Sequence, residues 1–253
     1  MQQRMDLQNI RKEAWALMRA NGYASVKATA LYLAVTLLLS EIGAASDSLL
    51  GKEIGPIRGM SFSFSFLGIL ASLVSLVLLT GYQYYCLRLH RGEGPGARSI
   101  FDPLSFAGQV VLLQIMINGL VILGASMFFL PGLYFGMCYA LAPLILCEEP
   151  DANALTAMRR SRERMVGHKL ELLALTVGFL PQVLGVLVAG VAVETLIWPL
   201  FPDSLAGSLA ALALEGVLIG CLRAFLQPYL GLALAGFYRR VTEQGTDVPA
   251  EWQ

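Results

Sequence analysis

Charged residues are scarce in this sequence. Asp, Glu, Lys and Arg make up 14% of its 253 residues, whereas hydrophobic residues make up 56%. Soluble domains carry about 25% charged residues, and a soluble fold of this length has too much surface to cover with so few charges. The composition therefore excludes an ordinary soluble protein and indicates a chain that lies largely in lipid.

Residues typical of catalytic and metal sites are also few. The two histidines, His90 and His168, stand in no His-x-x-x-His or Glu-x-x-His motif, so we expect no metal centre. The four cysteines have no CxxC spacing, which favours small buried hydrophobic residues over disulfides or metal ligands. The sequence contains no Gly-x-Ser-x-Gly elbow and no phosphate loop, and we expect neither an enzyme nor a cofactor.

Long apolar runs are what the sequence has instead. Residues 107–147 contain no charged residue and no histidine, and as a helix they would extend ~60 Å, twice the ~30 Å hydrocarbon core of a bilayer. Pro131 and Gly132 lie near the middle of this run, where a two-span hairpin would turn. We expect an all-α, polytopic transmembrane helical bundle in one membrane domain over residues 1–240, with a short cytoplasmic tail at 241–253. Six spans are predicted near 25–45, 66–87, 107–130, 132–147, 170–198 and 215–238, and the apolar stretch 199–214 either spans, re-enters or lies on the outer surface.

Two amphipathic segments accompany the predicted spans. Residues 6–20 predict a helix that either lies along the membrane surface or packs on the bundle. Residues 151–168 predict a basic interfacial helix, with Asp151 as its N-cap and Gly167 at its end. The stretch "SFSFSF" at 61–66 alternates like a strand, but an isolated strand leaves unpaired backbone groups at a membrane edge. We therefore expect a loop there that dips into the interface.

The cations are divided unevenly between the two sides of the predicted membrane. Fifteen of the eighteen Lys and Arg residues fall on the side of the N-terminus, and Lys52 and Arg58 fall on the opposite side. Because cytoplasmic loops carry the Lys/Arg excess, we expect both termini in the cytoplasm and the chain in the bacterial cytoplasmic membrane. Tyrosines at the inner ends of spans predict an interfacial aromatic belt; they are Tyr82, Tyr84, Tyr85 and Tyr238.

The densest basic segment, "AMRRSRERMVGHK" at 157–169, follows the fourth predicted span. We expect it to set the topology and to attract anionic lipid by ~1 kcal/mol per cation near the surface, while a specific site for an anionic ligand or for an unidentified membrane protein partner is the alternative. Nucleic acid is not expected, because one short basic helix tied to the membrane at both ends is no nucleic-acid-binding fold. The candidate contacts to anionic headgroups or to a partner are Arg159, Arg160, Arg162, Arg164 and Lys169.

Polar side chains inside the predicted spans form the second candidate site. A charge at mid-membrane costs ~2.5–3.5 kcal/mol on insertion scales, so Arg223 should face protein or water and have a partner. Counted back from Arg239 at ~1.5 Å per residue, it lies ~24 Å from the inner boundary, in the outer part of the hydrocarbon. We expect it to pair with Glu194, with Glu215 or with carbonyls exposed where Pro228 breaks the helix. The candidate residues of this polar pocket are Arg223, Gln227, Glu194, Glu215, Gln114 and Asn118, although Gln114 and Asn118 also suit hydrogen bonds between helices.

Four segments resemble one known family, in the family's order. They are "IRKEAWALMRANGY", "LRLHRGEGPGARSIFDPLSF", "LTAMRRSRERMVGHKLELLAL" and "QPYLGLALAGFYRRV". They resemble an uncharacterised bacterial family of multi-pass membrane proteins, catalogued as domain of unknown function nine hundred and seventy-five, and are loosely similar to membrane domains of glycerophosphodiester phosphodiesterases. The chain departs from the family pattern around 179–182 and between 191 and 220, where it has an extra apolar insertion. The matched family features are Arg160, Ser161, Met165, Gly167, Lys169, Pro228, Tyr229, Phe237 and Tyr238.

The resemblance implies architecture and location but no activity. We therefore expect a non-enzymatic integral membrane protein that organises lipids or partner proteins through a basic cytoplasmic face. The alternative is a small-solute transporter or channel component with a polar pocket around Arg223, since polar groups at mid-membrane are typical of transporters. A membrane-embedded enzyme that acts on lipids is the third hypothesis.

Overall fold

The protein folds almost entirely into helices, as the composition predicts. The computed structural model describes residues 7–50, 52–57, 60–197 and 205–246, and within them one two-stranded sheet accompanies the helices. In chain order the elements are α1 (Leu7–Ala20), α2 (Gly22–Leu50), β1 (Lys52–Ile57), β2 (Met60–Phe64), α3 (Phe66–His90), the 3-10 helix η1 (Ala97–Phe106), α4 (Ala107–Met127), α5 (Phe129–Tyr139), α6 (Ala142–Glu148), α7 (Ala154–Arg164), α8 (Lys169–Ile197) and α9 (Leu205–Thr246).

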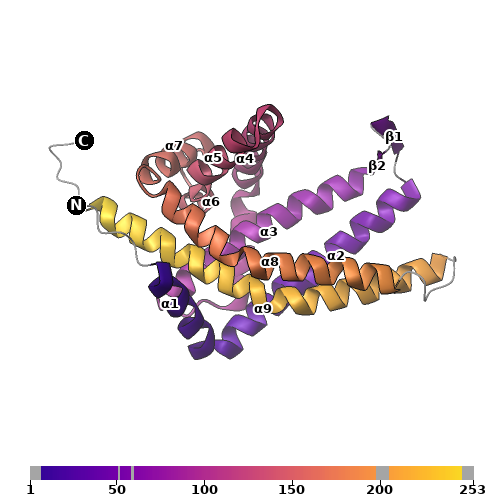
Figure 1. Cartoon of the computed structure of the whole chain (residues 1–253), viewed down its shortest axis with the longest axis horizontal. Coiled ribbons are helices and arrows are strands. Elements are labelled where there is room, and N and C mark those ends of the chain that lie inside the picture. The colour runs from indigo at the N-terminus through magenta and orange to yellow at the C-terminus, as the bar shows by residue number, and fades with distance from the viewer. Residues whose placement is uncertain (1–6, 51, 58–59, 198–204, 247–253) are drawn as a thin grey trace.

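Four long helices, α2, α3, α8 and α9, lie lengthwise in the molecule, and α4 to α7 gather beside one end of them (Figure 1). The same end holds α1 and the last turns of α9, and we call it the basic end because it carries the arginines of α7 together with Arg239 and Arg240 of α9. β1 and β2 lie at the opposite end, which we call the hairpin end (Figure 1). The segments whose Lys and Arg residues were counted on the side of the N-terminus thus lie together at one end of the structure.

Five helical segments within the described residues are long and apolar enough to cross a membrane. They are Val26–Gly43, Phe66–His90, Ala97–Met127, Leu130–Glu148 and Lys169–Ile197. The sixth predicted span, 215–238, lies inside the 42-residue helix α9, which is not among the five. On α8, Val177 and Val188 remain 53% and 65% exposed, as side chains that face lipid do. The chain is a polytopic α-helical membrane protein.

The stretch "SFSFSF" forms a strand rather than the expected loop. Met60–Phe64 is strand β2, and it pairs with β1 in an antiparallel register that places Lys52 opposite Phe64 and Ile54 opposite Phe62. We expected a loop because an isolated strand would leave unpaired backbone groups at a membrane edge. The preceding residues form the partner strand β1, so these backbone groups are paired. The N-cap Ser65 then begins α3: its Oγ accepts the Gly68 N–H at 2.9 Å and the Ser46 hydroxyl at 2.8 Å.

The apolar run 107–147 folds back on itself, but not at Pro131 and Gly132. The turn lies three residues earlier, at Phe128, whose extended backbone separates α4 from α5. Pro131 falls in the first turn of α5, where its missing N–H costs no hydrogen bond. Gly132 instead allows close packing, because a Cβ at this position would stand 2.8 Å from the Ala125 nitrogen of α4.

Two further sequence expectations concern helix ends and prolines. Pro228 does not break its helix, since α9 continues from Leu205 to Thr246 around it, and α8 likewise continues through Pro181. Membrane helices tolerate such prolines because neighbouring groups satisfy the freed carbonyls. α7 begins at Ala154 with Asn153, not Asp151, as its N-cap residue. Parts of several predictions lie outside the described residues. They are the first residue of the predicted helix 6–20, residues 198–204 at the end of the fifth predicted span and in the apolar stretch 199–214, the outer cation Arg58, and the predicted tail from 247 onward.

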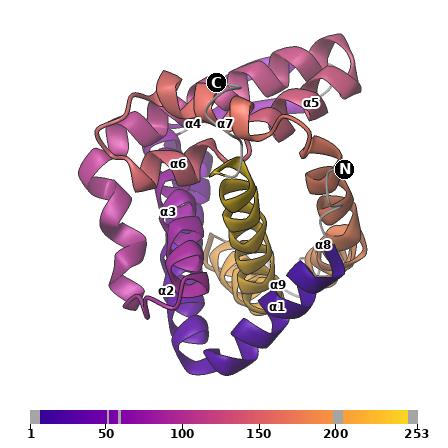
Figure 2. The same cartoon turned by 90° about the vertical axis from the view of Figure 1, so that its left-hand side faces the viewer.

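The core lies at the basic end, around the last turns of α9. Figure 2, viewed from this end, shows α9 in the middle with α1, α3, α7 and α8 around it. Tyr82, Tyr85 and Tyr238 are 1%, 1% and 0% exposed, so these tyrosines are core residues and the predicted interfacial belt is wrong for them. Tyr82 stacks on Tyr32 with ring centroids 4.7 Å apart, and its hydroxyl lies 2.9 Å from the Thr29 hydroxyl. α1 packs on this core through Ile10 and Ala14, which favours the packed alternative for the N-terminal helix.

Candidate functional site

Helix α7 has one packed face and one exposed face. Ala154, Ala157, Met158, Ser161 and Met165 are buried, and the Ser161 hydroxyl donates to the Cys138 carbonyl at 2.9 Å. The opposite face carries residues at helical spacing that are all exposed; we call them the α7 stripe, and they are Leu155, Arg159, Arg162 and Val166. The packed face fixes the rotation of the helix, so the stripe points away from the protein.

The five cations predicted as one contact surface divide into two groups. Arg159 and Arg162 are exposed, and no hydrogen bond or ion pair is found for either within the described residues. The other three have partners inside the protein: Arg160 pairs with Glu149, Arg164 Nη1 donates to the Tyr238 hydroxyl at 2.8 Å, and Lys169 Nζ donates to the Tyr134 hydroxyl at 2.7 Å. The available contact surface is therefore narrower than the sequence predicts.

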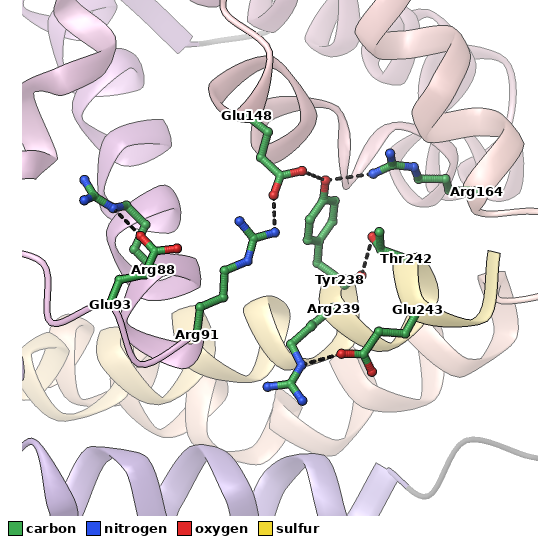
Figure 3. A network of polar contacts seen from close by, with 9 residues as sticks. All are labelled: Arg88, Arg91, Glu93, Glu148, Arg164, Tyr238, Arg239, Thr242 and Glu243. Carbon is green, nitrogen blue, oxygen red and sulfur yellow. Dashed lines mark hydrogen bonds and ion pairs between the residues drawn. The ribbon is translucent and has the colours of Figure 1, made fainter. Parts of the chain in front are cut away.

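A polar network ties the basic end together (Figure 3). Its centre is Glu148 at the end of α6, which accepts from the hydroxyl of Tyr238 on α9 and from the guanidinium of Arg91 beyond α3. Arg164 of α7 adds the 2.8 Å bond to the same tyrosine hydroxyl. Four segments far apart in the sequence thus meet at one carboxylate and one hydroxyl. Hydrogen bonds to charged groups contribute about 1.5–3 kcal/mol each when they are shielded from water, so the network stabilises the contact of α7 with α9.

This network was missed in the sequence because its partners lie up to 90 residues apart. The carboxylates nearest in sequence to the basic segment are not bound to Arg162 in any described ion pair: Glu148 binds Arg91, and Glu149 binds Arg160. Glu171 lies 2.8 Å from His168 Nδ1. A carboxylate directly after an apolar run, close to several arginines, was the available signal for Glu148.

A cavity of about 1050 Å³ lies among α2, α3, α8 and α9. Arg223 and Gln227 of α9 line it together, so two of the predicted pocket residues do meet. Hydroxyl residues at helical spacing on α2 also line it; they are Tyr32, Thr36 and Ser40. Their period of four is visible in the sequence, although they were not among the predicted pocket residues.

The other predicted pocket residues are not brought to this cavity by any described contact. Gln114 of α4 donates to the Thr80 hydroxyl of α3 at 3.4 Å, a hydrogen bond between helices. Asn118, one turn later, is exposed. Glu194 and Glu215 lie in α8 and α9, but their side chains are outside the described part of the structure.

The register of α9 against its neighbours gives the position of Arg223. Gly220 faces the Leu37 side chain of α2, and Tyr229 packs edge-on against Phe179 of α8 with ring centroids 4.9 Å apart. At ~1.5 Å per residue these contacts put Arg223 level with residues near 34 on α2 and near 185 on α8, which is the middle of both helices. The contacts give a level along the helices and not a depth in lipid, so the expected position in the outer hydrocarbon stays a prediction. Arg223 is exposed to the cavity, where its charge acts on the Tyr32 hydroxyl, and no hydrogen bond or ion pair is found for its guanidinium among the described side chains.

The comparison with protein families matches almost the whole chain. The family described as Protein of unknown function (DUF975) covers residues 1–245. The chain belongs to the DUF975 family. No match is found among curated proteins or among solved structures. Of the residues through which the sequence resembles the family, the DUF975 fold places Ser161, Met165, Phe237 and Tyr238 in the core of the basic end. Gly167 has a φ of +87°, which favours glycine, in the turn between α7 and α8.

Proposed function

We propose that this DUF975 protein is a non-enzymatic integral membrane protein that binds anionic phospholipid headgroups at its basic end. The α7 stripe is the observation that supports this proposal. Two arginines without a described partner stand between two apolar side chains, Leu155 and Val166, which are 64% and 67% exposed. At a membrane interface the apolar pair enters the headgroup region, while the arginines meet phosphates with the bidentate geometry that guanidinium favours.

The proposed setting is the cytoplasmic membrane of a bacterium, with the basic end inside. The supporting observation is the uneven distribution of Lys and Arg, fifteen of which belong to segments on the side of the N-terminus. Inner leaflets rich in anionic lipid attract such a surface by ~1 kcal/mol for each cation close to it. Because the network around Glu148 holds α7 against α9, the stripe is presented as a rigid surface rather than as a mobile tail.

Lipid selectivity in vesicles tests this proposal. Wild-type protein and the double variant Arg159→Gln/Arg162→Gln are placed in phosphatidylcholine vesicles that contain some spin-labelled phosphatidylglycerol. We expect the wild type to enrich phosphatidylglycerol at its surface and the double variant to lose up to ~2 kcal/mol of this preference, a factor of up to about 30 at low salt. Added salt should weaken the preference of the wild type and leave the double variant unchanged.

A charge-matched control separates local binding from a general effect of charge. Lys52→Gln/Arg58→Gln removes the same charge from the opposite side of the predicted membrane, and we expect it to keep the preference. If both double variants lose the preference for phosphatidylglycerol equally, or if neither variant loses it, the α7 stripe is not a headgroup site. Retained lipid preference, together with the loss of a membrane protein that co-purifies with the wild type, would favour the partner-protein alternative.

The cavity among the long helices supports a second candidate, a component that binds or moves a solute through the membrane. Arg223 is a cation level with the middle of α2 and α8, and ionisable groups at that depth are typical of substrate pathways. Uptake of solutes into vesicles, compared between wild type and Arg223→Gln, tests this candidate. Equal uptake by both proteins and by protein-free vesicles would count against it.

A further inference from the structure

The walls of the cavity combine a long apolar surface with one cation. On α3 the lining runs from Gly68 to Leu79, and on α2 it runs from Tyr32 to Gly43. At ~1.5 Å per residue each of these stretches is ~16 Å long, close to the thickness of one leaflet of a ~30 Å hydrocarbon core. Arg223 is the one charged residue among the described lining residues. The cavity is thus an elongated apolar groove with a single positive charge.

The charge lies toward one end of this groove. Arg223 is level with residues near 34 on α2, so most of the α2 wall, out to Gly43, lies on its hairpin-end side. On α3 the corresponding wall ends at Gly68, and the contact of Gly231 with the Cys86 side chain puts Arg223 level with residues near 78. The apolar part of the groove therefore extends ~14 Å from the guanidinium toward the hairpin end.

Few other polar groups of the walls are free to bind a ligand. The Thr36 and Ser40 hydroxyls donate to carbonyls of their own helix at 2.8 Å, and the Ser72 hydroxyl of α3 does the same at 2.9 Å. Their hydrogens are thus used within the protein. Gln227, one turn after Arg223 on the same face, lines the cavity with no hydrogen bond found for its amide in the described structure. Arg223, Gln227 and the Tyr32 hydroxyl, on which the charge of Arg223 acts, remain as donors at one end of the groove.

We propose that this groove is a binding site for a single-chain amphiphile with an anionic head group, held with its head at Arg223 and Gln227 and its chain along α2 and α3 toward Gly43 and Gly68. A purely apolar molecule would leave the guanidinium unpaired in the hydrocarbon, which is costly. A small polar anion would pair with Arg223 but leave the apolar walls without contacts. An anionic amphiphile satisfies both, and a volume of about 1050 Å³ suits a ligand of that size.

Binding of a graded series of amphiphiles to the purified protein in detergent tests this proposal by native mass spectrometry. The probes are fatty acids from hexanoate to hexadecanoate, lysophosphatidylglycerol, the uncharged alcohol dodecanol, and acetate. We expect fatty-acid affinity to rise about fourfold per methylene and to level off once the chain exceeds ~14 Å. Dodecanoate should bind at least tenfold more tightly than dodecanol, and acetate should not bind measurably. The ratio of fatty acid to lysophosphatidylglycerol identifies whether a carboxylate or a lipid phosphate is the preferred head group.

Three variants assign the binding to this groove. Arg223→Gln should lower dodecanoate affinity tenfold or more and leave dodecanol unchanged, whereas Arg223→Lys should retain most of the affinity. Ser72→Phe, which fills the groove beside α3, should weaken dodecanoate and dodecanol alike. An Arg223→Gln protein that binds dodecanoate like the wild type would overturn the proposal, and so would acetate affinity equal to that of dodecanoate. Because α7 lies at the basic end, Arg159→Gln/Arg162→Gln should leave dodecanoate binding unchanged. A negative result for the groove therefore does not contradict the headgroup proposal, and a negative result for the α7 stripe does not contradict the groove.

Discussion

The hydrogen bond between Glu148 and Tyr238 should couple α6 to α9 measurably. Tyr238 is fully buried at 0% exposure and the Glu148 side chain is 21% exposed, so water replaces this bond poorly. A hydrogen bond to a charged group in such surroundings contributes about 1.5–3 kcal/mol. We expect Tyr238→Phe to lower the free energy of unfolding by at least that amount, because it also removes the acceptor of the Arg164 hydrogen bond. Glu148→Ala should likewise cost at least that amount, because it also leaves Arg91 without its partner.

A double-mutant cycle isolates the coupling between the two side chains. The free energy of unfolding is measured in mixed micelles for the wild type, Glu148→Ala, Tyr238→Phe and the double variant, and we expect a coupling energy of about 1.5 kcal/mol or more. The pair Arg239–Glu243 on the same helix is the control, with side chains 46% and 60% exposed. Its coupling should stay at about 0–0.5 kcal/mol, as for other exposed pairs. Equal coupling in the two cycles would refute the reasoning that burial strengthens the Glu148 bond.

Two further predictions concern packing and topology. Gly81→Ala should destabilise the protein by about 1–3 kcal/mol or prevent folding, because its Cβ would lie 1.9 Å from the Ile100 carbonyl oxygen, whereas Gly108→Ala, with nothing within 4 Å, should fold normally; thermal unfolding in detergent compares the two variants. In a cysteine-free background, a membrane-impermeant maleimide added to intact cells should label Lys52→Cys but not Arg160→Cys. Labelling of Arg160→Cys from outside would reverse the proposed orientation.

The membrane character and most helices of this protein follow from local patterns in the sequence. An uncharged apolar run such as 107–147 has to satisfy its backbone within itself in lipid, so it predicts helices wherever it lies in the fold. The amphipathic period of residues 6–20 likewise corresponds to α1, with Ile10 and Ala14 on its buried face. The resemblance of four short segments to the family is confirmed, because the family model matches residues 1–245, which contain all four.

Local patterns misplaced features that depend on a neighbouring segment. A strand at 60–64 is stable because β1 supplies hydrogen bonds, and the pattern of β2 alone contains no information on that partner. The hairpin turn lies at Phe128 rather than at Pro131, because Gly124 and Gly132 let α4 and α5 approach there while a proline fits the first turn of a helix. Proline and glycine mark a break in a sequence, but packing decides where the chain turns.

In the candidate sites, too, some features follow from local sequence and others depend on packing between helices. The sequence by itself determined that positive charge collects after the fourth predicted span and that Arg223 stands alone in an apolar stretch. Only the tertiary structure decided that Arg164 binds Tyr238 while Arg159 and Arg162 stay exposed, because that choice depends on which face of α7 packs on the core. Only the packing of α9 against α2 and α8 places Arg223 at mid-helix beside a groove. Charge and hydropathy are properties of single residues, whereas pairing and depth are properties of contacts between helices that are distant in the sequence.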